Sequence, residues 1–230
     1  MAEEHSRGAT ITMTRVYVFC EGQTEETFVR EVLAAHFQRL NIWLIPLLLS
    51  TSRRGKGGVG SYGKIKRQLE LQCKQDSTAW VTLLADFYAF PKDAPGMDIS
   101  CSDVFEKVLH IIEAIEKDIN QPNLIVNLLI HEFEGLLFSK PEAFQAWFKH
   151  PQVVEQLETI RQQFETPELI DEGVETAPSK RILRICNQYD KILHGSLIAL
   201  DIGLDCIRKE CTFFNQWVQR LEALSPAPKI

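Results

Sequence analysis

Apolar residues in the first part of the chain form two alternating kinds of segment. Between positions 28–40 and again at 103–119, apolar residues recur every three or four positions, which is the spacing of an amphipathic helix. Four continuous runs of apolar and β-branched residues end in polar or charged residues: 15–20, 42–49, 80–87 and 123–134. Continuous apolar strands that alternate with helices are typical of a parallel sheet buried on both faces. The pattern therefore predicts an α/β fold with a central, mostly parallel sheet flanked by helices.

Two local features refine this prediction. Pro46 lies inside the second run, and because proline cannot donate a hydrogen bond to a neighbouring strand, we expect this strand at an edge of the sheet and the first strand in its interior. Thr24 is expected to cap the helix that follows the first strand. Glu25 and Glu26 would lie in the first turn of that helix, where the helix dipole favours acids. We interpret both as residues of a helix cap or a solvated turn, outside any functional site.

After Ser139 the pattern changes to helices only. Candidate helices begin at Pro141 and Pro151, and a loop separates them from a final helical stretch that ends near Leu224. The sequence thus divides into a disordered tail, an α/β core, a helical C-terminal extension packed on the core, and a short tail, at 1–13, 14–139, 140–224 and 225–230.

Composition narrows the class of protein. The chain has 230 residues, 45% of them hydrophobic and 24% charged, enough for one domain with a full core. It contains no apolar run of membrane-spanning length, so no membrane partner is expected. Six cysteines occur without CxxC pairs, which indicates reduced thiols and a cytoplasmic location. A net charge of -6 argues against a protein that coats nucleic acid over its whole surface, but not against a local basic groove.

Acidic residues follow three of the predicted strands: Glu21, Asp86, and the pair Glu132 and Glu134. Ligands of open parallel sheets bind outside the carboxyl ends of the strands, so we expect these side chains to converge. Converging carboxylates repel one another unless a hard cation such as Mg²⁺ neutralises them. If residues 131–134 are extended, Glu132 and Glu134 face the same side; if a helix has already begun, they diverge and only one joins the site. Each acid alone could instead cap a helix or lie in a solvated turn.

Five stretches, in this order, resemble a bacterial, Toprim-like domain-of-unknown-function family (DUF4276), which is distantly related to OLD-type Toprim nucleases: CEGQTEETFV, ADFYAFP, HEFEGLLF, ETAPSKRI and YDKILHGSLIA. The likeness extends from about Thr14 to Leu224, nearly the whole chain. Toprim domains are the metal-dependent catalytic cores of topoisomerases, primases and OLD-type nucleases. The resemblance implies a Toprim-like fold and a site that uses Mg²⁺ or Mn²⁺.

The resemblance also implies roles for individual acids. Glu21 matches the acid after the first Toprim strand, which acts as general acid/base or metal ligand. Asp86 matches the first acid of the Toprim Asp-x-Asp pair, but Tyr88 stands where the second Asp is expected. That departure leaves the usual two-acid metal site incomplete, and Glu132 or Glu134 could restore the number of ligands.

A glycine-rich basic segment follows the second strand and leads into a helix. Backbone amides at a helix start, together with cations, attract phosphates. The alternative is a solvated loop whose charges serve solubility. Because members of the resembled family tend to carry a similar segment here, we favour phosphate binding by its cations, Arg53, Arg54, Lys56, Lys64 and Arg67.

Cations also gather where a later loop enters a helix, at Lys180 and Arg181. Cations at a helix N-terminus oppose the dipole, so a local reason for them is expected. An anionic ligand would be one such reason, and a salt bridge to an acid of residues 171–175 is the other. Lys191 allows the same two interpretations.

The leading hypothesis is a nuclease-like, Mg²⁺-dependent enzyme that cleaves phosphodiester bonds in DNA or RNA, with Glu21 as acid/base and Lys180 and Arg181 as stabilisers of the transition-state charge. The resemblance implies a setting in phage defence beside an AAA/ABC-type ATPase. A homodimer is a separate expectation. A degenerate Toprim-like protein that binds nucleotide, nucleic acid or the ATPase as an adaptor is the alternative, which Tyr88 favours. A small-molecule phosphatase or phosphotransferase would use the same metal site, and fold alone does not decide among these functions.

Overall fold

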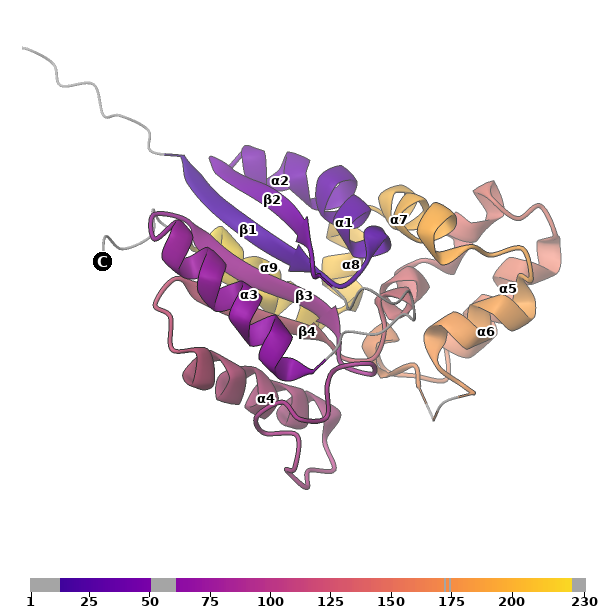
Figure 1. Cartoon of the computed structure of the whole chain (residues 1–230). Coiled ribbons are helices and arrows are strands. Elements are labelled where there is room, and N and C mark those ends of the chain that lie inside the picture. The colour runs from indigo at the N-terminus through magenta and orange to yellow at the C-terminus, as the bar shows by residue number, and fades with distance from the viewer. Residues whose placement is uncertain (1–12, 51–60, 172, 174, 225–230) are drawn as a thin grey trace, which may run out of the picture.

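A computed structural model describes residues 13–50, 61–171, 173 and 175–224 (Figure 1). Its centre is a four-stranded sheet in the order β2-β1-β3-β4, and every neighbouring pair is parallel. The strands are β1 (Thr14–Cys20), β2 (Ile42–Leu48), β3 (Trp80–Asp86) and β4 (Leu124–Leu129). Apart from Met13, the tails predicted at 1–13 and 225–230 lie outside the described residues.

The predicted arrangement of the strands is confirmed. β1 lies in the interior of the sheet, between β2 and β3, and Pro46 lies in the edge strand β2, opposite Val18. The fourth strand is shorter than predicted, because it ends at Leu129 and the chain forms a 3₁₀ helix, η2 (Phe133–Ser139). Glu132, directly before η2, still has an extended backbone.

The helix after β1 is continuous but irregular. It consists of α1 (Gln23–Phe28), a π-helical turn η1 (Val29–Leu33) and α2 (Ala34–Gln38). The prediction that Thr24 caps this helix was wrong: the cap residue is Gly22, whose N–H donates to Glu25 Oε2 at 2.9 Å. The Glu25 carboxylate thus satisfies an N–H that would otherwise lack a partner at the helix start.

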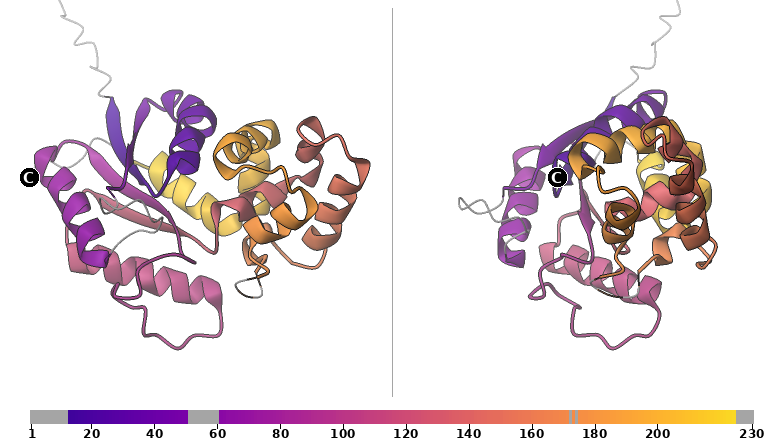
Figure 2. Two further views of the ribbon diagram at one scale, coloured as in Figure 1. Left: turned by 45° about the vertical axis from the view of Figure 1, so that its right-hand side comes forward. Right: turned by 90° about the vertical axis from the view of Figure 1, so that its right-hand side faces the viewer.

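Two layers of helices enclose the sheet (Figure 2). On one face lie α3 (Tyr62–Gln75) and α4 (Val104–Ile119), which bury their apolar side chains with Val81, Leu83 and Val126. On the other face, α1, α2 and the C-terminal α9 (Thr212–Glu222) pack in a cluster that contains Val16 and Val18. Alternate residues of each strand therefore enter different cores, as expected for strands covered on both faces.

The other C-terminal helices lie largely beyond the carboxyl ends of the strands (Figure 1). They are η3 (Pro141–Ala146), α5 (Pro151–Arg161), η4 (Pro167–Leu169), α6 (Pro178–Ile185), α7 (Lys191–Ile202) and α8 (Leu204–Glu210). The described residues after Leu129 contain no strand, which confirms the predicted helical extension. Within the described ranges, no helix combines the length and apolar character that a bilayer span requires.

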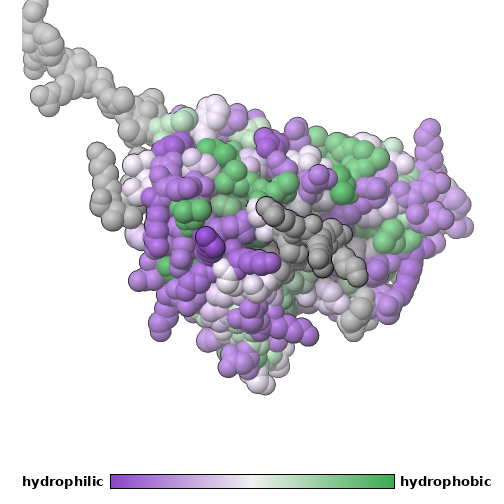
Figure 3. All heavy atoms as spheres, in the orientation of Figure 1, coloured by the Kyte–Doolittle hydropathy of each residue, from purple (hydrophilic) through white to green (hydrophobic). Residues whose placement is uncertain are grey.

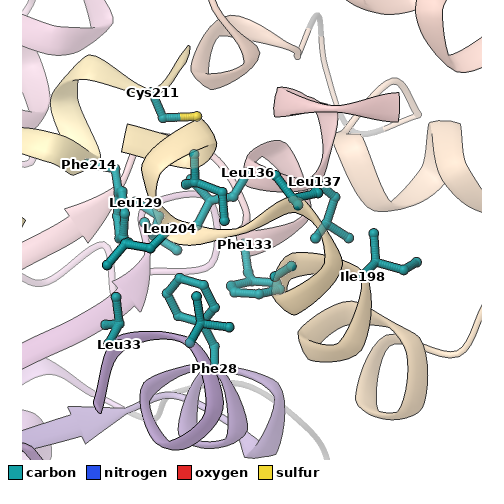
Figure 4. Close-up of a cluster of buried hydrophobic side chains, with 14 of the residues drawn as sticks. Phe28, Leu33, Leu129, Phe133, Leu136, Leu137, Ile198, Leu204, Cys211 and Phe214 are labelled. Carbon is teal, nitrogen blue, oxygen red and sulfur yellow. The ribbon is translucent and has the colours of Figure 1, made fainter. Parts of the chain in front are cut away.

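A cluster of aromatic side chains joins the first helix to the C-terminal extension (Figure 4). The ring of Phe28 lies 5.2 Å from that of Phe133 in an edge-to-face arrangement and 6.0 Å from that of Phe214. All three side chains are buried. This packing fixes α1, η2 and α9 relative to one another, and α1 and η2 carry acidic residues of the site described below.

A buried hydrogen bond ties α9 to the sheet. Trp217 Nε1 donates to Thr82 Oγ1 at 3.0 Å, and both residues are buried. We expect Thr82→Val to keep the shape of the side chain but lower the free energy of unfolding by about 1–2 kcal/mol, because the indole N–H would lose its partner. Urea denaturation measures this change. A variant as stable as the wild type would show that the hydrogen bond contributes nothing.

Candidate functional site

Glu21 lies at the carboxyl end of β1, where it contacts the end of β3. Its backbone N–H donates to Leu84 O at 3.3 Å. Its side-chain Oε2 accepts the backbone N–H of Asp86 at 3.2 Å. Because β1 and β3 are parallel neighbours, their last residues reach the same edge of the sheet, and the two acids meet there.

Asp86 in turn connects β3 to the segment after β4. Its side chain is almost fully buried, with the residue 6% exposed, and its Oδ1 accepts the backbone N–H of Phe133 at 2.9 Å. Phe133 is flanked in sequence by Glu132 and Glu134. The hydrogen bond therefore holds the first turn of η2, with its two acids, beside the end of β3.

The two glutamates of η2 point to different partners, which is the second of the two arrangements considered from the sequence. Glu132 Oε2 accepts the backbone N–H of Ser179 at the start of α6, at 3.0 Å. Glu134 is completely buried, and its Oε1 accepts a hydrogen bond from the hydroxyl of Tyr189 at 3.4 Å. The divergence follows from the 3₁₀ turn that begins at Phe133.

Lys191, the first residue of α7, extends its ammonium group among these acids. Its Nζ lies 3.2 Å from Glu134 Oε2, 3.5 Å from Asp86 Oδ2 and 3.7 Å from Glu25 Oε1. Glu25 is therefore more than the cap residue predicted, because its other carboxylate oxygen faces Lys191. We call the group formed by these acids the acidic cluster: Glu21, Glu25, Asp86, Glu132 and Glu134.

Among the described residues of this cluster and their ion-pair partners, acids outnumber cations. Burial raises the pKa of Glu21, with repulsion from Glu25 adding to the shift, although the Asp86 N–H opposes it. Burial also raises the pKa of Asp86 and of Glu134, and Lys191 opposes both shifts. For Lys191, burial lowers the pKa, but attraction to Asp86, Glu134 and Glu25 outweighs it and raises the pKa. One ammonium thus leaves several carboxylates short of a counter-charge.

The donor atoms of the acidic cluster fit a hard divalent cation in their chemistry. All are carboxylate oxygens, the ligands that Mg²⁺ and Mn²⁺ prefer. Glu134 Oε2 is buried and makes no well-aligned hydrogen bond with any described residue, although Lys191 Nζ is 3.2 Å away. However, within the described ranges no three metal-ligating side chains stand ready-placed around one point. A bound ion would therefore require the carboxylates to turn towards it.

The cations predicted beside the acids lie at the start of α6. Lys180 is exposed. Arg181 is partly buried; its Nε donates to Thr176 O at 2.6 Å, and its guanidinium lies 5.4 Å from the centre of the Phe164 ring. The contact between α6 and the acidic cluster is made by the Ser179 N–H. The catalytic role of Lys180 and Arg181 remains a prediction.

The structure describes only part of the predicted phosphate-binding segment. Arg53, Arg54 and Lys56 lie outside the described residues. Lys64 and Arg67 are exposed in the first turns of α3, and their phosphate-binding role remains a prediction. Tyr88, where the resemblance implies an acid, is 41% exposed and donates its backbone N–H to His131 O at 3.1 Å.

The sequence did not identify Glu25 and Lys191 as members of this site, although both are charged residues near a helix start. Glu25 has the position of an ordinary first-turn acid, and only its burial to 2% exposure distinguishes it from Glu26. For Lys191 the sequence leaves an anionic ligand and a salt bridge open. The structure shows ion pairs, but with acids that lie far away in the sequence. The signal that could have identified Lys191 is the need of several buried acids for a cation.

One family model and three solved structures are similar to this chain. The family model described as "Domain of unknown function (DUF4276)" matches residues 20–222. Three solved structures of the C-terminal region of the Xanthomonas campestris pv. campestris OLD protein, phased with platinum, iodine and mercury, share 15–16% identity with this chain at a TM-score of 0.39. Those matches cover 90–91% of this chain and 95–99% of the other. The comparison with curated proteins found no match. At that identity and TM-score, the structural likeness assigns no activity.

Proposed function

The chain belongs to the DUF4276 family, and on that premise we propose that its acidic cluster binds Mg²⁺ or Mn²⁺ and cleaves phosphodiester bonds in DNA or RNA. The observation that carries the proposal is that, among the described residues, three buried carboxylates share the single ammonium of Lys191: those of Glu25, Asp86 and Glu134. Such a surplus costs free energy unless protons or a cation offset it. A structural role alone would be served at less cost by apolar or neutral residues.

The residues proposed to hold the ion are Glu21, Asp86 and Glu134. Of the two diverging glutamates, Glu134 is chosen because its carboxylate and that of Asp86 face the same Lys191 ammonium. When bound there, the ion would supply a positive charge for the phosphate and lower the pKa of a bound water. Glu21 is the proposed acid/base, because burial raises its pKa towards neutral pH. A carboxyl group whose pKa lies near the working pH can both accept and release a proton. The hydrogen bond from the Asp86 N–H holds the Glu21 carboxylate in one orientation.

Partners of this activity are also proposals. We propose nucleic acid as substrate and an ATPase of the AAA/ABC type, or a second copy of the chain, as a regulatory partner in phage defence. The support is a surface next to the acidic cluster: Ile192, Leu193 and Leu200 of α7 are 58%, 57% and 46% exposed, and Figure 3 shows apolar surface over this helix. Apolar surface beside a site is suited to contact with another protein.

A second function has a specific observation in its favour. The ion pairs of Lys191 with Glu25, Asp86 and Glu134 supply a positive charge without any metal. Together with Tyr88 in place of the second Toprim acid, they favour a catalytically degenerate protein that binds nucleotide, nucleic acid or the ATPase as an adaptor. Metal binding decides between the two functions.

Thermal unfolding in the presence of Mg²⁺ tests the metal site. A ligand that binds only the folded state stabilises it, and we expect saturating Mg²⁺ to raise Tm by about 5 °C near pH 8. The pKa values of Glu21, Asp86 and Glu134 are raised, so these groups hold protons at higher pH than free carboxyls do. Protons compete with the ion, and the Mg²⁺-induced shift should therefore shrink as the pH falls towards about 5. A Tm independent of Mg²⁺ at both pH values would favour the adaptor.

A further inference from the structure

The C-terminal extension contains a groove between α5 and α6 whose lining differs from the rest of this acidic chain. A cavity of about 550 Å³ lies between the start of α5 and the end of α6, and a second of about 330 Å³ adjoins it. Gln156 of α5 and Ile185 of α6 line both cavities, so the two adjoin, and together we call them the α5–α6 groove. Its combined size suits more than one nucleotide unit.

None of the described residues that line the groove is an aspartate or glutamate. The floor is apolar, with Phe148 and Val153 buried, and the rim is formed by amide side chains such as Gln152, Asn187 and Gln188. In a chain of net charge -6, a groove without acids on its lining is distinctive. The combination of an apolar floor with amide and cationic groups is suited to a base attached to phosphates.

Trp147 provides a flat aromatic surface at one end of the groove. Trp147 is 37% exposed. Its Nε1 donates to Asp201 Oδ2 at 2.7 Å, and this hydrogen bond fixes the orientation of the ring. The ring of His194 supports it in an edge-to-face arrangement at 6.0 Å. An exposed indole held in this way can stack a base with little loss of side-chain freedom.

Cations lie at both ends of the groove. Lys149 is exposed next to Trp147. Arg184, on α6, has a side chain 57% exposed, and it pairs at 3.2 Å with Glu175, whose side chain is 79% exposed. An ion pair this exposed contributes little, so a phosphate could replace the Glu175 carboxylate at small cost. Arg181 also lines the groove, with its guanidinium over Phe164.

We propose that the α5–α6 groove binds an unpaired strand of nucleic acid, with a base stacked on Trp147 and phosphates beside Lys149 and Arg184. This inference depends on the proposed function, because it specifies single-stranded nucleic acid as the substrate of the acidic cluster. The chain connects the two places directly. Ser179, at the start of α6, donates to Glu132, and Tyr189, which follows the groove residue Gln188, donates to Glu134.

An unpaired strand fits these features better than a duplex. A base reaches an aromatic side chain in a depression only when it is unstacked from its own helix. Aromatic stacking combined with backbone cations is the common mode of binding to single strands, and it tolerates many sequences. A duplex would instead present phosphates to the rim, and Trp147 would contribute nothing to its binding.

Fluorescence anisotropy with a labelled oligothymidine tests the proposal in the absence of metal. The probe is a strand of about 12 nucleotides, within the usual range of site sizes, and EDTA prevents cleavage. We expect Trp147→Ala to weaken binding by about tenfold, since one stacked base is lost. Trp43→Ala is the matched control, because Trp43 is also exposed (46%) but lies on the edge strand β2. Equal affinities of wild type and Trp147→Ala would overturn the proposal.

A second variant covers the case in which Trp147→Ala disturbs folding. Lys149→Ala combined with Arg184→Ala changes only exposed side chains and should reduce the salt dependence of log Kd by about two phosphate contacts. An unchanged salt dependence would contradict the inference. So would a loss of affinity for a DNA duplex in Trp147→Ala as large as its loss for the single strand, because Trp147 is expected to contribute nothing to duplex binding. Because binding is measured without metal, loss of the groove leaves the Mg²⁺-induced rise in Tm intact, and failure of the metal site leaves strand binding intact.

Discussion

Glu21→Gln should reduce Mg²⁺-dependent cleavage of nucleic acid by about 10²–10⁴-fold, the usual effect of removing a general acid or base. The amide keeps the shape of the side chain and can still accept the Asp86 N–H through its oxygen. It removes the charge and the basicity of a group whose pKa is raised by burial. Cleavage of a labelled strand in the presence of Mg²⁺, with EDTA as a blank, measures the loss.

The control for this experiment is Glu26→Gln. Glu26 lies in the same first turn of α1, but its carboxylate pairs with Arg30 at 2.8 Å on the same helix and does not belong to the acidic cluster. We expect this variant to cleave at nearly the wild-type rate. Full activity of Glu21→Gln, or equal loss in both variants, would place the active site elsewhere.

Of the substitutions proposed for this protein, Lys191→Met should lower the free energy of unfolding the most. It keeps most of the side-chain volume but leaves Asp86, Glu134 and Glu25 without their cation. Breaking a buried ion pair by removing one partner costs several kcal/mol. Because 41% of the Lys191 side chain is exposed, solvent screens part of the charge, and we expect a loss of about 2 kcal/mol. Urea denaturation at neutral pH measures it.

The pH dependence of this loss has a definite sign. Removing Lys191 raises the pKa values of Asp86 and Glu134 further above those of the unfolded chain, so the folded state binds more protons than the unfolded state. Stability is then lost as the pH rises through the carboxyl range, and the loss in Lys191→Met should be larger near pH 8 than near pH 5. Mg²⁺ should restore part of it, if the acidic cluster binds the ion in place of the ammonium.

Lys66→Met is the matched control for stability. Lys66 Nζ lies 2.9 Å from Asp118 Oδ2, but both side chains are substantially exposed, at 31% and 38%. Such a surface pair contributes about 0–1 kcal/mol. If Lys191→Met and Lys66→Met lose the same small amount at both pH values, the ammonium of Lys191 does not stabilise the acids as described.

The positions of the strands could be predicted because burial on both faces leaves a continuous apolar run, and Pro46 marked the edge. The end of the fourth strand could not, because no glycine or proline follows Leu129 before Gly135, and only tertiary packing selects the 3₁₀ helix that begins at Phe133. The cap of α1 was misplaced for a related reason. Glu25 satisfies the Gly22 N–H, so the side chain of Thr24 is not needed there.

The acids of the site could be predicted from one regularity, that parallel strands end at the same edge of a sheet. This brought Glu21 and Asp86 together, with the acids of η2 beside them. Lys191 could not be placed in the same way, because no local pattern links the start of α7 to Glu25, Asp86 and Glu134, which lie in three earlier segments of the chain. The packing of Phe28 against Phe133 and Phe214, which helps to fix these elements, is likewise a tertiary property.

Mn²⁺ titration followed by electron paramagnetic resonance tests the central claim, that the acidic cluster is a divalent-metal site. We expect the wild-type protein to remove the signal of free Mn²⁺ near pH 8, and Asp86→Asn to weaken this binding by at least about tenfold. Glu155→Gln, which changes an exposed acid of α5, should bind as the wild type does. A wild-type protein that leaves Mn²⁺ free, or an Asp86→Asn variant that binds it equally well, would contradict the claim.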